Sequence, residues 1–159
     1  MRRSEREVVG LDNVLEILGR CEVLRLGLCA GDRPYIVPMN FAYEAVDGQV
    51  FIYLHCASEG RKLDMIARNS FVCFEADCSY KIKKADAACG WSAEYESVIG
   101  EGEVCVLTDE GQKIKAMDAL MKRYGFPGKP EYKAETLARV TALRILVSSI
   151  TGKRNLNKQ

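Results

Sequence analysis

The spacing of apolar residues along the chain predicts six β-strands and three helices. Aromatic and β-branched residues between turn signals are typical of strands, whereas apolar residues at intervals of three and four are typical of helices. The strands are expected over residues 21–30, 33–43, 51–54, 71–76, 93–107 and 138–150. They follow one another without regular helical crossovers, which favours an antiparallel sheet closing as a barrel with helices at its ends.

Capping residues place the helix ends. Asp12 is expected to cap a first helix that runs through Leu18, and Thr108 is expected to cap the last helix, which runs to about Tyr124. The buried stripe of that last helix is expected to comprise Ile114, Met117, Leu120 and Met121. Residues 77–91 have no clear period and are expected to be irregular.

Two of the predicted strands contain residues that disturb a regular ladder. Pro38 has no N–H group to donate, so its strand is expected at a sheet edge or with a bulge beside Asn40. Gly100 and Gly102 interrupt the strand over 93–107. Glycines inside a strand predict strong curvature or a close approach of another backbone.

Residues 51–69 change from a strand to a helix, and the turn through Gly60 is followed by two cations. A helix N-terminus already concentrates unpaired N–H groups and partial positive charge. Arg61 and Lys62 strengthen that field, which predicts a phosphate-binding turn. The alternative is that both cations lie on a solvated helix face. His55 is the only histidine and ends the strand just before this turn, which favours a functional site.

The composition is that of an ordinary globular protein, and residues 1–159 are expected to form one domain. The chain has 23 basic and 22 acidic residues, and a net charge of +1 gives no reason to expect nucleic acid as a partner. The low net charge leaves little repulsion against self-association. A polar start and the lack of a long apolar run predict a cytoplasmic protein with no membrane partner.

Seven cysteines are present without a CxxC pair. With a single histidine in the chain, this spacing predicts no metal site. Reduced thiols fit the cytosol. Four of the cysteines stand in strand-like surroundings and are expected to be small core residues: Cys21, Cys29, Cys73 and Cys105.

Four motifs occur in an order that resembles the nitroimidazole-resistance (Nim) family. They are RPYIVPMNFAY, IYLHCASEGRKLDMIARN, ESVIGEGEV and ITGK, and the resemblance covers the chain from about Arg6 to Lys153. That family belongs to the flavoproteins similar to pyridoxamine 5'-phosphate oxidase. The resemblance implies a mainly β fold with peripheral helices, a six-stranded antiparallel split β-barrel that binds FMN at a homodimer interface.

The resemblance also implies which residues contact the cofactor. Arg61 and Lys62, preceded by Gly60, match the pair that holds the FMN phosphate. Val37, Pro38, Met39 and Asn40 match the strand whose backbone runs along the isoalloxazine ring. Tyr53, Leu54 and His55 match contacts of the next strand with the cofactor, and Ser97 matches a polar position on the strand that follows. His55 corresponds to a histidine near the flavin. Lys153 matches a basic residue of the ITGK motif whose role stays open.

The chain departs from true pyridoxamine-phosphate oxidases. Val37 and Ala42 stand where those enzymes place an arginine and a lysine, and GKRNLNKQ replaces their C-terminal substrate segment. The departures argue against oxidation of vitamin B6. The resemblance instead implies an FMN-dependent oxidoreductase that reduces small aromatic or nitroaromatic compounds, with His55 as the catalytic proton donor. Two alternatives stay open: His55 has only a structural role at an interface, or the protein binds flavin or haem without turnover.

Overall fold

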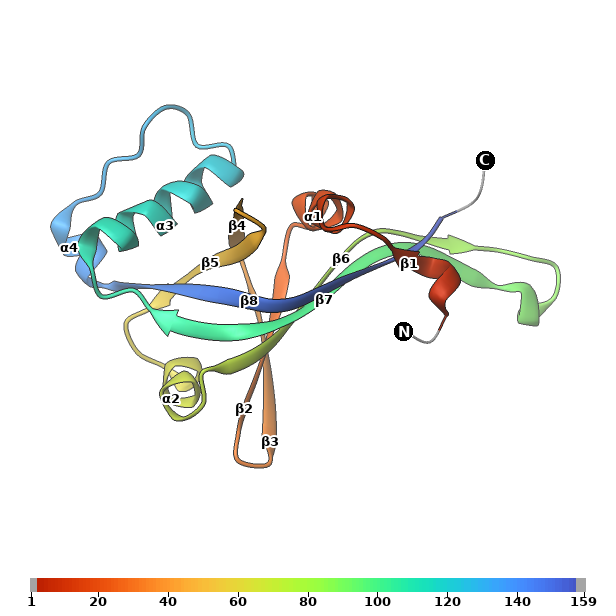
Figure 1. The fold of residues 1–159 in the computed structure, drawn as a ribbon, viewed down its shortest axis with the longest axis horizontal. Helices are drawn as coiled ribbons and strands as arrows, with labels where there is room; N and C mark the ends of the chain where they lie inside the picture. The colour runs from red at the N-terminus through yellow and green to blue at the C-terminus, as the bar shows by residue number, and fades with distance from the viewer. Residues whose placement is uncertain (1–2, 157–159) are drawn as a thin grey trace.

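The computed structural model describes residues 3–156, and β-strands are its largest component (Figure 1). The strands are β1 (Glu7–Val8), β2 (Leu24–Ala30), β3 (Arg33–Met39), β4 (Phe41–Val46), β5 (Gln49–Ala57), β6 (Phe71–Lys83), β7 (Ser92–Val106) and β8 (Val140–Asn155). The helices are α1 (Leu11–Arg20), α2 (Arg61–Arg68), α3 (Glu110–Arg123) and α4 (Ala134–Ala138), with short 3-10 turns at Ser4–Arg6 and Ala88–Gly90. None of these helices is long and apolar enough to cross a bilayer.

The eight strands form one antiparallel sheet in the order β3-β2-β6-β7-β8-β5-β4, and β1 pairs with β8. This confirms the mainly β, antiparallel class. The expected count of six is corrected to eight, because the strand expected over 33–43 is divided at Asn40 into β3 and β4, and because β1 was not expected. No ladder joins β3 to β4 within residues 3–156, so the sheet curves without closing.

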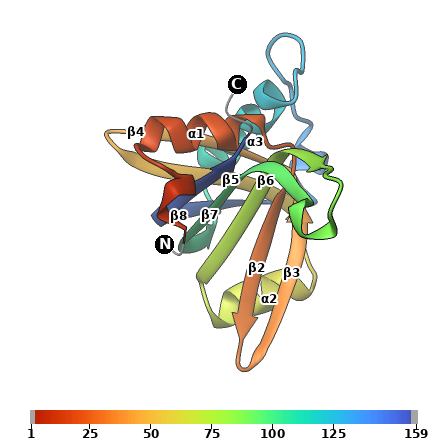
Figure 2. The same cartoon turned by 90° about the vertical axis from the view of Figure 1, so that its right-hand side faces the viewer.

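The strand that carries Pro38 lies at an edge of the sheet, as predicted. Within residues 3–156, β3 pairs only with β2, and Pro38 lies opposite Arg25 in that ladder. An edge strand tolerates a residue without an N–H group because one side of its backbone has no strand to bond. The β2–β3 hairpin extends away from the rest of the sheet, beside α2 (Figure 2).

The two glycines of β7 permit close approaches, as predicted. A Cβ atom on Gly100 would lie 2.2 Å from the Phe74 ring, and one on Gly102 would lie 2.2 Å from the carbonyl oxygen of Leu146. The register of β7 with β8 shifts between Glu101 and Gly102. Both positions therefore need glycine so that β7 can lie close to Phe74 of β6 and to the backbone of β8.

Two apolar clusters lie on opposite faces of the sheet. The inner cluster fills the curve of the sheet and includes buried side chains of α1 and α2. The outer cluster forms where α3 packs on β4, β5 and β8, and its buried members are Ala42, Tyr53, Leu107, Ala116, Met117, Leu120 and Ala142. The sheet therefore presents one outer face that α3 covers only in part (Figure 1).

Several local predictions were wrong. Gly10, not Asp12, precedes α1, and Asp109, not Thr108, caps α3 by accepting a hydrogen bond from the Gln112 N–H group at 2.9 Å. β6 continues to Lys83, so the irregular segment is shorter than expected. Of the four cysteines expected in the core, only Cys21 is buried; the exposed ones are Cys29, Cys73 and Cys105. Alternation along a strand turned these three outward.

Candidate functional site

The sheet is open between β3 and the end of β5, and most of the expected cofactor residues border this opening. On one side, β3 has a strand partner only in β2. On the other, the ladder of β5 with β4 ends at Leu54, whereas residues 55–57 pair only with β8. Within the described chain, backbone N–H and C=O groups along both edges therefore lack a strand partner and are available to a bound molecule.

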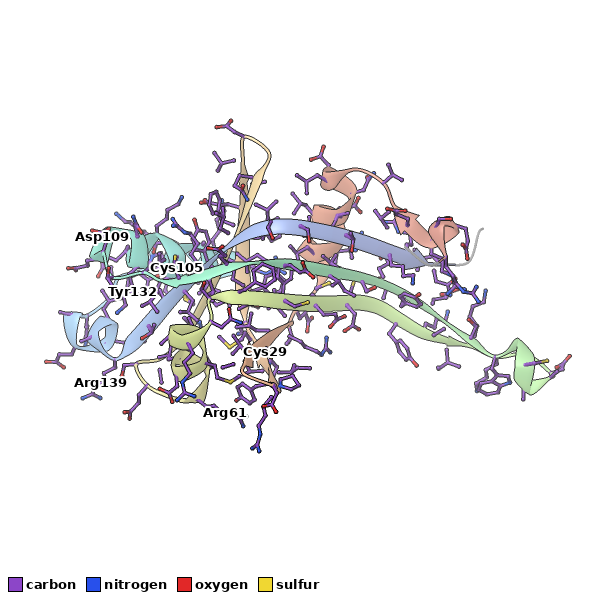
Figure 3. All side chains as sticks on the ribbon, turned by 60° about the horizontal axis from the view of Figure 1, so that its bottom comes forward. Cys29, Arg61, Cys105, Asp109, Tyr132 and Arg139 are labelled. Atoms are coloured by element: carbon purple, nitrogen blue, oxygen red, sulfur yellow. The ribbon has the colours of Figure 1, made fainter. Side chains whose placement is uncertain are left out.

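Helix α2 begins beside this opening and places two cations there. Gly60 precedes it with a φ of 136°, a conformation that side chains disfavour, and no side chain caps the helix. Figure 3 shows Arg61 beside α2. Its guanidinium lies 4.5 Å from the ring centroid of Tyr35 on β3, and Lys62 follows it in the chain. An uncapped helix N-terminus with two cations suits an anion such as a phosphate group.

His55 lies at the same corner and is half-buried. Its Nδ1 atom is buried without a hydrogen-bond partner in the described chain. Burial lowers the pKa of His55 below its ordinary value, and the charge of Lys62 lowers it further. The imidazole is therefore mainly neutral at pH 7, and a buried nitrogen without a partner is a feature that a ligand would satisfy.

The end of α3 holds the bend between β3 and β4. The ladder of β4 with β5 ends at the pair of Phe41 and Leu54, which directly follow Asn40 and precede His55 in the chain. The hydroxyl of Tyr124 accepts a hydrogen bond from the Phe41 N–H group at 3.1 Å. The guanidinium of Arg123 lies 4.2 Å from the Phe41 ring centroid. Sequence reasoning missed Arg123 and Tyr124, because no local pattern links the end of α3 to a strand more than 80 positions earlier.

Three of the expected cofactor residues have buried side chains. Met39 and Leu54 lie in the inner cluster, and Tyr53 lies in the outer cluster, where its hydroxyl donates to the carboxylate of Glu44. At Met39 only the backbone is available at the opening, whereas Leu54 lies between Phe41 of β4 and Leu143 of β8 in the two ladders. Contacts with a cofactor along this part of the opening would therefore be made by backbone groups and by the more exposed Val37, Pro38 and Asn40.

Ser97 and Lys153 lie elsewhere on the sheet. They are partners in the β7–β8 ladder and border a cavity of about 380 Å³ on the outer face, lined by Ser97, Ile99, Thr151, Gly152 and Lys153. His55 pairs with Ala142 of β8, eleven positions before Lys153. At roughly 3.3 Å per residue, His55 and Lys153 are about 35 Å apart along β8. One chain therefore does not bring them around the same small molecule.

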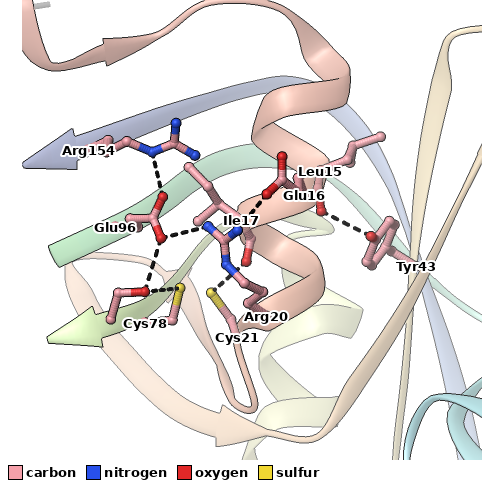
Figure 4. A network of polar contacts seen from close by, with 10 residues as sticks. Leu15, Glu16, Ile17, Arg20, Cys21, Tyr43, Cys78, Glu96 and Arg154 are labelled. Carbon is pink, nitrogen blue, oxygen red and sulfur yellow. Dashed lines mark hydrogen bonds and ion pairs between the residues drawn. The ribbon is translucent and has the colours of Figure 1, made fainter. Parts of the chain in front are cut away.

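A buried carboxylate braces the same strands from their inner side (Figure 4). Glu96 is only 3% exposed and accepts hydrogen bonds from Arg20 Nη2 at 2.6 Å, Arg154 Nε at 2.5 Å and Ser79 Oγ at 3.0 Å. Burial opposes ionisation, but the hydrogen bonds from Arg154 and Ser79 outweigh it and lower the pKa of Glu96. The network ties α1 and β6 to β7 and β8, the two strands that carry Ser97 and Lys153.

Comparison with known proteins identifies the family. The family model described as pyridoxamine 5'-phosphate oxidase matches residues 11–154. No curated protein matches the chain. Among solved structures, a candidate 5-nitroimidazole antibiotic resistance protein from Bacteroides thetaiotaomicron VPI-5482 is 28% identical, and the match covers 92% of this chain and 85% of that one with a TM-score of 0.80.

Two more distant structures share the fold. The flavocytochrome Anf3 from Azotobacter vinelandii is 16% identical over 99% of this chain and 72% of its own, with a TM-score of 0.81. An FAD and heme binding protein from Mycobacterium smegmatis is 16% identical over 96% of this chain and 74% of its own, also with a TM-score of 0.81. The resemblance drawn from the four motifs is thereby confirmed, and the chain belongs to the pyridoxamine 5'-phosphate oxidase family.

Proposed function

We propose that the protein binds FMN in the opening between β3 and β5 and reduces small nitroaromatic compounds. One observation carries the proposal: the cations Arg61 and Lys62, the uncapped start of α2 and the unpartnered Nδ1 of His55 meet where two strand edges lack partners. The similarity to a candidate 5-nitroimidazole resistance protein supports the reductase activity. The seven free cysteines support a cytoplasmic setting.

When bound, FMN supplies the redox chemistry. Arg61 and Lys62 hold its phosphate by charge-assisted hydrogen bonds, and the first N–H groups of α2 add their dipoles. Backbone groups on the two free strand edges orient the ring system. His55 supplies a proton to the nitro substrate from its imidazole. Because the phosphate offsets the charge of Lys62, the pKa of His55 is expected to rise when FMN binds.

We further propose that two copies build each site. Ser97 and Lys153 lie about 35 Å from His55 along β8, so they belong to the site of a partner chain. The outer face near them carries exposed apolar side chains, namely Ile36 (67%), Ile99 (51%) and Phe71 (50%). These apolar side chains share the face with the ion pairs of Arg25 with Glu75 and Asp77, and a mixed face of this kind suits a symmetric homodimer.

Ile99→Arg is expected to separate the dimer and to weaken FMN binding by at least about tenfold, because burying an unpaired charge in the interface is unfavourable. Size-exclusion chromatography with light scattering and FMN titration measure the two effects. Val9→Arg is the matched control, since Val9 is also apolar and is 79% exposed outside this sheet face. An Ile99→Arg protein that stays dimeric and binds FMN normally contradicts the proposed interface.

The absorption spectrum of the purified protein tests the proposed cofactor. Flavin bands that bleach on reduction, and that return when a nitroimidazole is added without oxygen, are the expected result. A Soret band without flavin bands contradicts the proposal and supports a haem-binding module. Flavin bands that do not respond to nitroaromatic compounds leave FMN binding in place and remove the proposed reductase activity.

A further inference from the structure

A separate cavity of about 320 Å³ lies on the outer face of the sheet, beside the start of α3. Its floor is formed by β4, β5 and β8, and the residues that line it are Glu44, Val46, Phe51, Tyr53, Leu107, Gln112, Lys115 and Arg144. Neither His55 nor Arg61 is among them. The volume is at the lower end of the range for small-molecule pockets, about 300–1,000 Å³.

The apolar part of this cavity includes an aromatic ring. Phe51 lies on β5 with Val46 and Leu107 nearby, and the three form the apolar lining. Val46 at the end of β4 is 49% exposed and the Lys115 side chain is 59% exposed, so these two residues lie on the solvent-facing rim of the cavity. A space of this size with an aromatic wall suits a ligand with a single ring.

Two of the three charges in the cavity neutralise each other. The Nζ atom of Lys115 lies 2.7 Å from Glu44 Oε1, and the hydroxyl of Tyr53 donates to the same oxygen. Burial opposes ionisation of Glu44, but the hydrogen bonds from Lys115 and Tyr53 outweigh it and lower the pKa of Glu44. The hydrogen bond to Glu44 raises the pKa of Lys115. Both groups are therefore charged at pH 7 and paired.

Arg144 supplies the third charge; it makes no direct ion pair within residues 3–156, although its charge helps to lower the pKa of Glu44. It lies opposite Tyr53 in the β5–β8 ladder, and its guanidinium is 5.6 Å from the ring centroid of Phe51. Its Nε atom is buried without a hydrogen-bond partner, and no ion pair joins Arg144 to a carboxylate among residues 3–156. A buried N–H donor without an acceptor is unfavourable, and a planar carboxylate is the group that matches a guanidinium best.

We propose that this cavity binds a small aromatic carboxylate, with the carboxylate at Arg144 and the ring against Phe51. A neutral aromatic compound could offer an uncharged acceptor at most, and it would leave the guanidinium charge unpaired. A small aliphatic acid would satisfy Arg144 but would leave the aromatic wall in contact with water. The site uses none of the cations assigned to FMN, so the proposal stands apart from the proposed reductase activity.

Isothermal titration calorimetry of the protein as purified tests this site with three probes. Benzoate is expected to bind saturably, with one molecule per chain. Benzyl alcohol keeps the ring without the charge, and acetate keeps the charge without the ring; each is expected to bind at least about tenfold more weakly. Absence of benzoate binding, or equal binding of benzyl alcohol, overturns the proposal.

Three variants place the binding in this cavity. Arg144→Gln removes the unpaired charge and Val46→Trp fills the entrance, and each is expected to weaken benzoate binding by at least about tenfold. Arg33→Gln is the matched control at the exposed start of β3 and is expected to bind benzoate normally. Because Val46→Trp leaves every charge in place, it decides the question if Arg144→Gln does not fold. Normal benzoate binding by Val46→Trp overturns the assignment.

Discussion

Replacing Arg61 and Lys62 together by alanine is expected to weaken FMN binding by about 10²–10⁴-fold. Each charge-assisted hydrogen bond to the phosphate contributes about 1.5–3 kcal/mol, so two such bonds contribute about 3–6 kcal/mol. Both residues lie in the first turn of α2, where no side chain competes for the N–H groups. Quenching of flavin fluorescence during titration of the apoprotein measures the affinity, and riboflavin, which has no phosphate, is expected to lose little.

The comparison of the two flavins separates loss of the phosphate contact from general damage. Arg68→Ala is the matched control, because Arg68 is a cation of the same helix but lies in its last turn. It is expected to bind FMN with nearly wild-type affinity. If the double variant keeps its FMN affinity, or if riboflavin binding falls by the same factor, the phosphate is not held at the start of α2.

Features of the fold that a residue imposes on its own stretch of backbone could be predicted from the sequence. Pro38 predicted an edge strand and Gly100 predicted a close approach, because each residue restricts its own backbone. A bulge beside Asn40 was the alternative to an edge strand, and the structure divides the strand at that residue. The hydrogen bond from the Phe41 N–H group to the hydroxyl of Tyr124, at the far end of α3, could not be predicted. The alternation within a strand does not show which face of the sheet other elements cover. For this reason Cys29, Cys73 and Cys105 were expected in the core although they are exposed.

The same distinction applies to the candidate site. His55 and Arg61 are close in the chain, so one motif was enough to predict that they lie together. The network of Glu96 with Arg20 and Arg154 joins three distant segments and has no local signature. The unpaired Arg144 is likewise recognisable only when burial and partners are known. Charges that sequence analysis treats as ordinary surface residues acquire their chemistry from tertiary neighbours.

Replacing His55 by alanine is expected to slow nitro reduction by about 10²–10⁴-fold, the usual loss for a general acid. The wild-type rate is expected to fall as pH rises through the pKa of His55, because only the protonated ring carries the extra proton. In the flavin-free protein that pKa lies below its ordinary value of 6.5, first through burial and then through Lys62. The phosphate of FMN is expected to move it upward, which NMR titration of the single histidine with and without FMN measures directly.

Stability should show the opposite dependence on pH. The pKa of His55 is lower in the folded than in the unfolded protein, so the unfolded state binds the proton more readily. The free energy of unfolding of the flavin-free protein is therefore expected to fall as pH drops below about 6.5. Urea denaturation across this range measures it, and His55→Gln, which cannot titrate, is expected to remove that part of the dependence.

Single-turnover oxidation of the pre-reduced protein by a nitroimidazole decides whether His55 acts in the chemistry. The measurement starts from bound, reduced flavin, so it is insensitive to differences in flavin loading. If His55 donates the proton, both His55→Ala and His55→Gln retain flavin and react slowly, and the pH dependence of the wild-type rate disappears in both. If His55 is only structural, His55→Ala loses stability or dimer while the rate per bound flavin stays at the wild-type value. That second outcome would remove the catalytic role of His55 and leave the proposed FMN site unaffected.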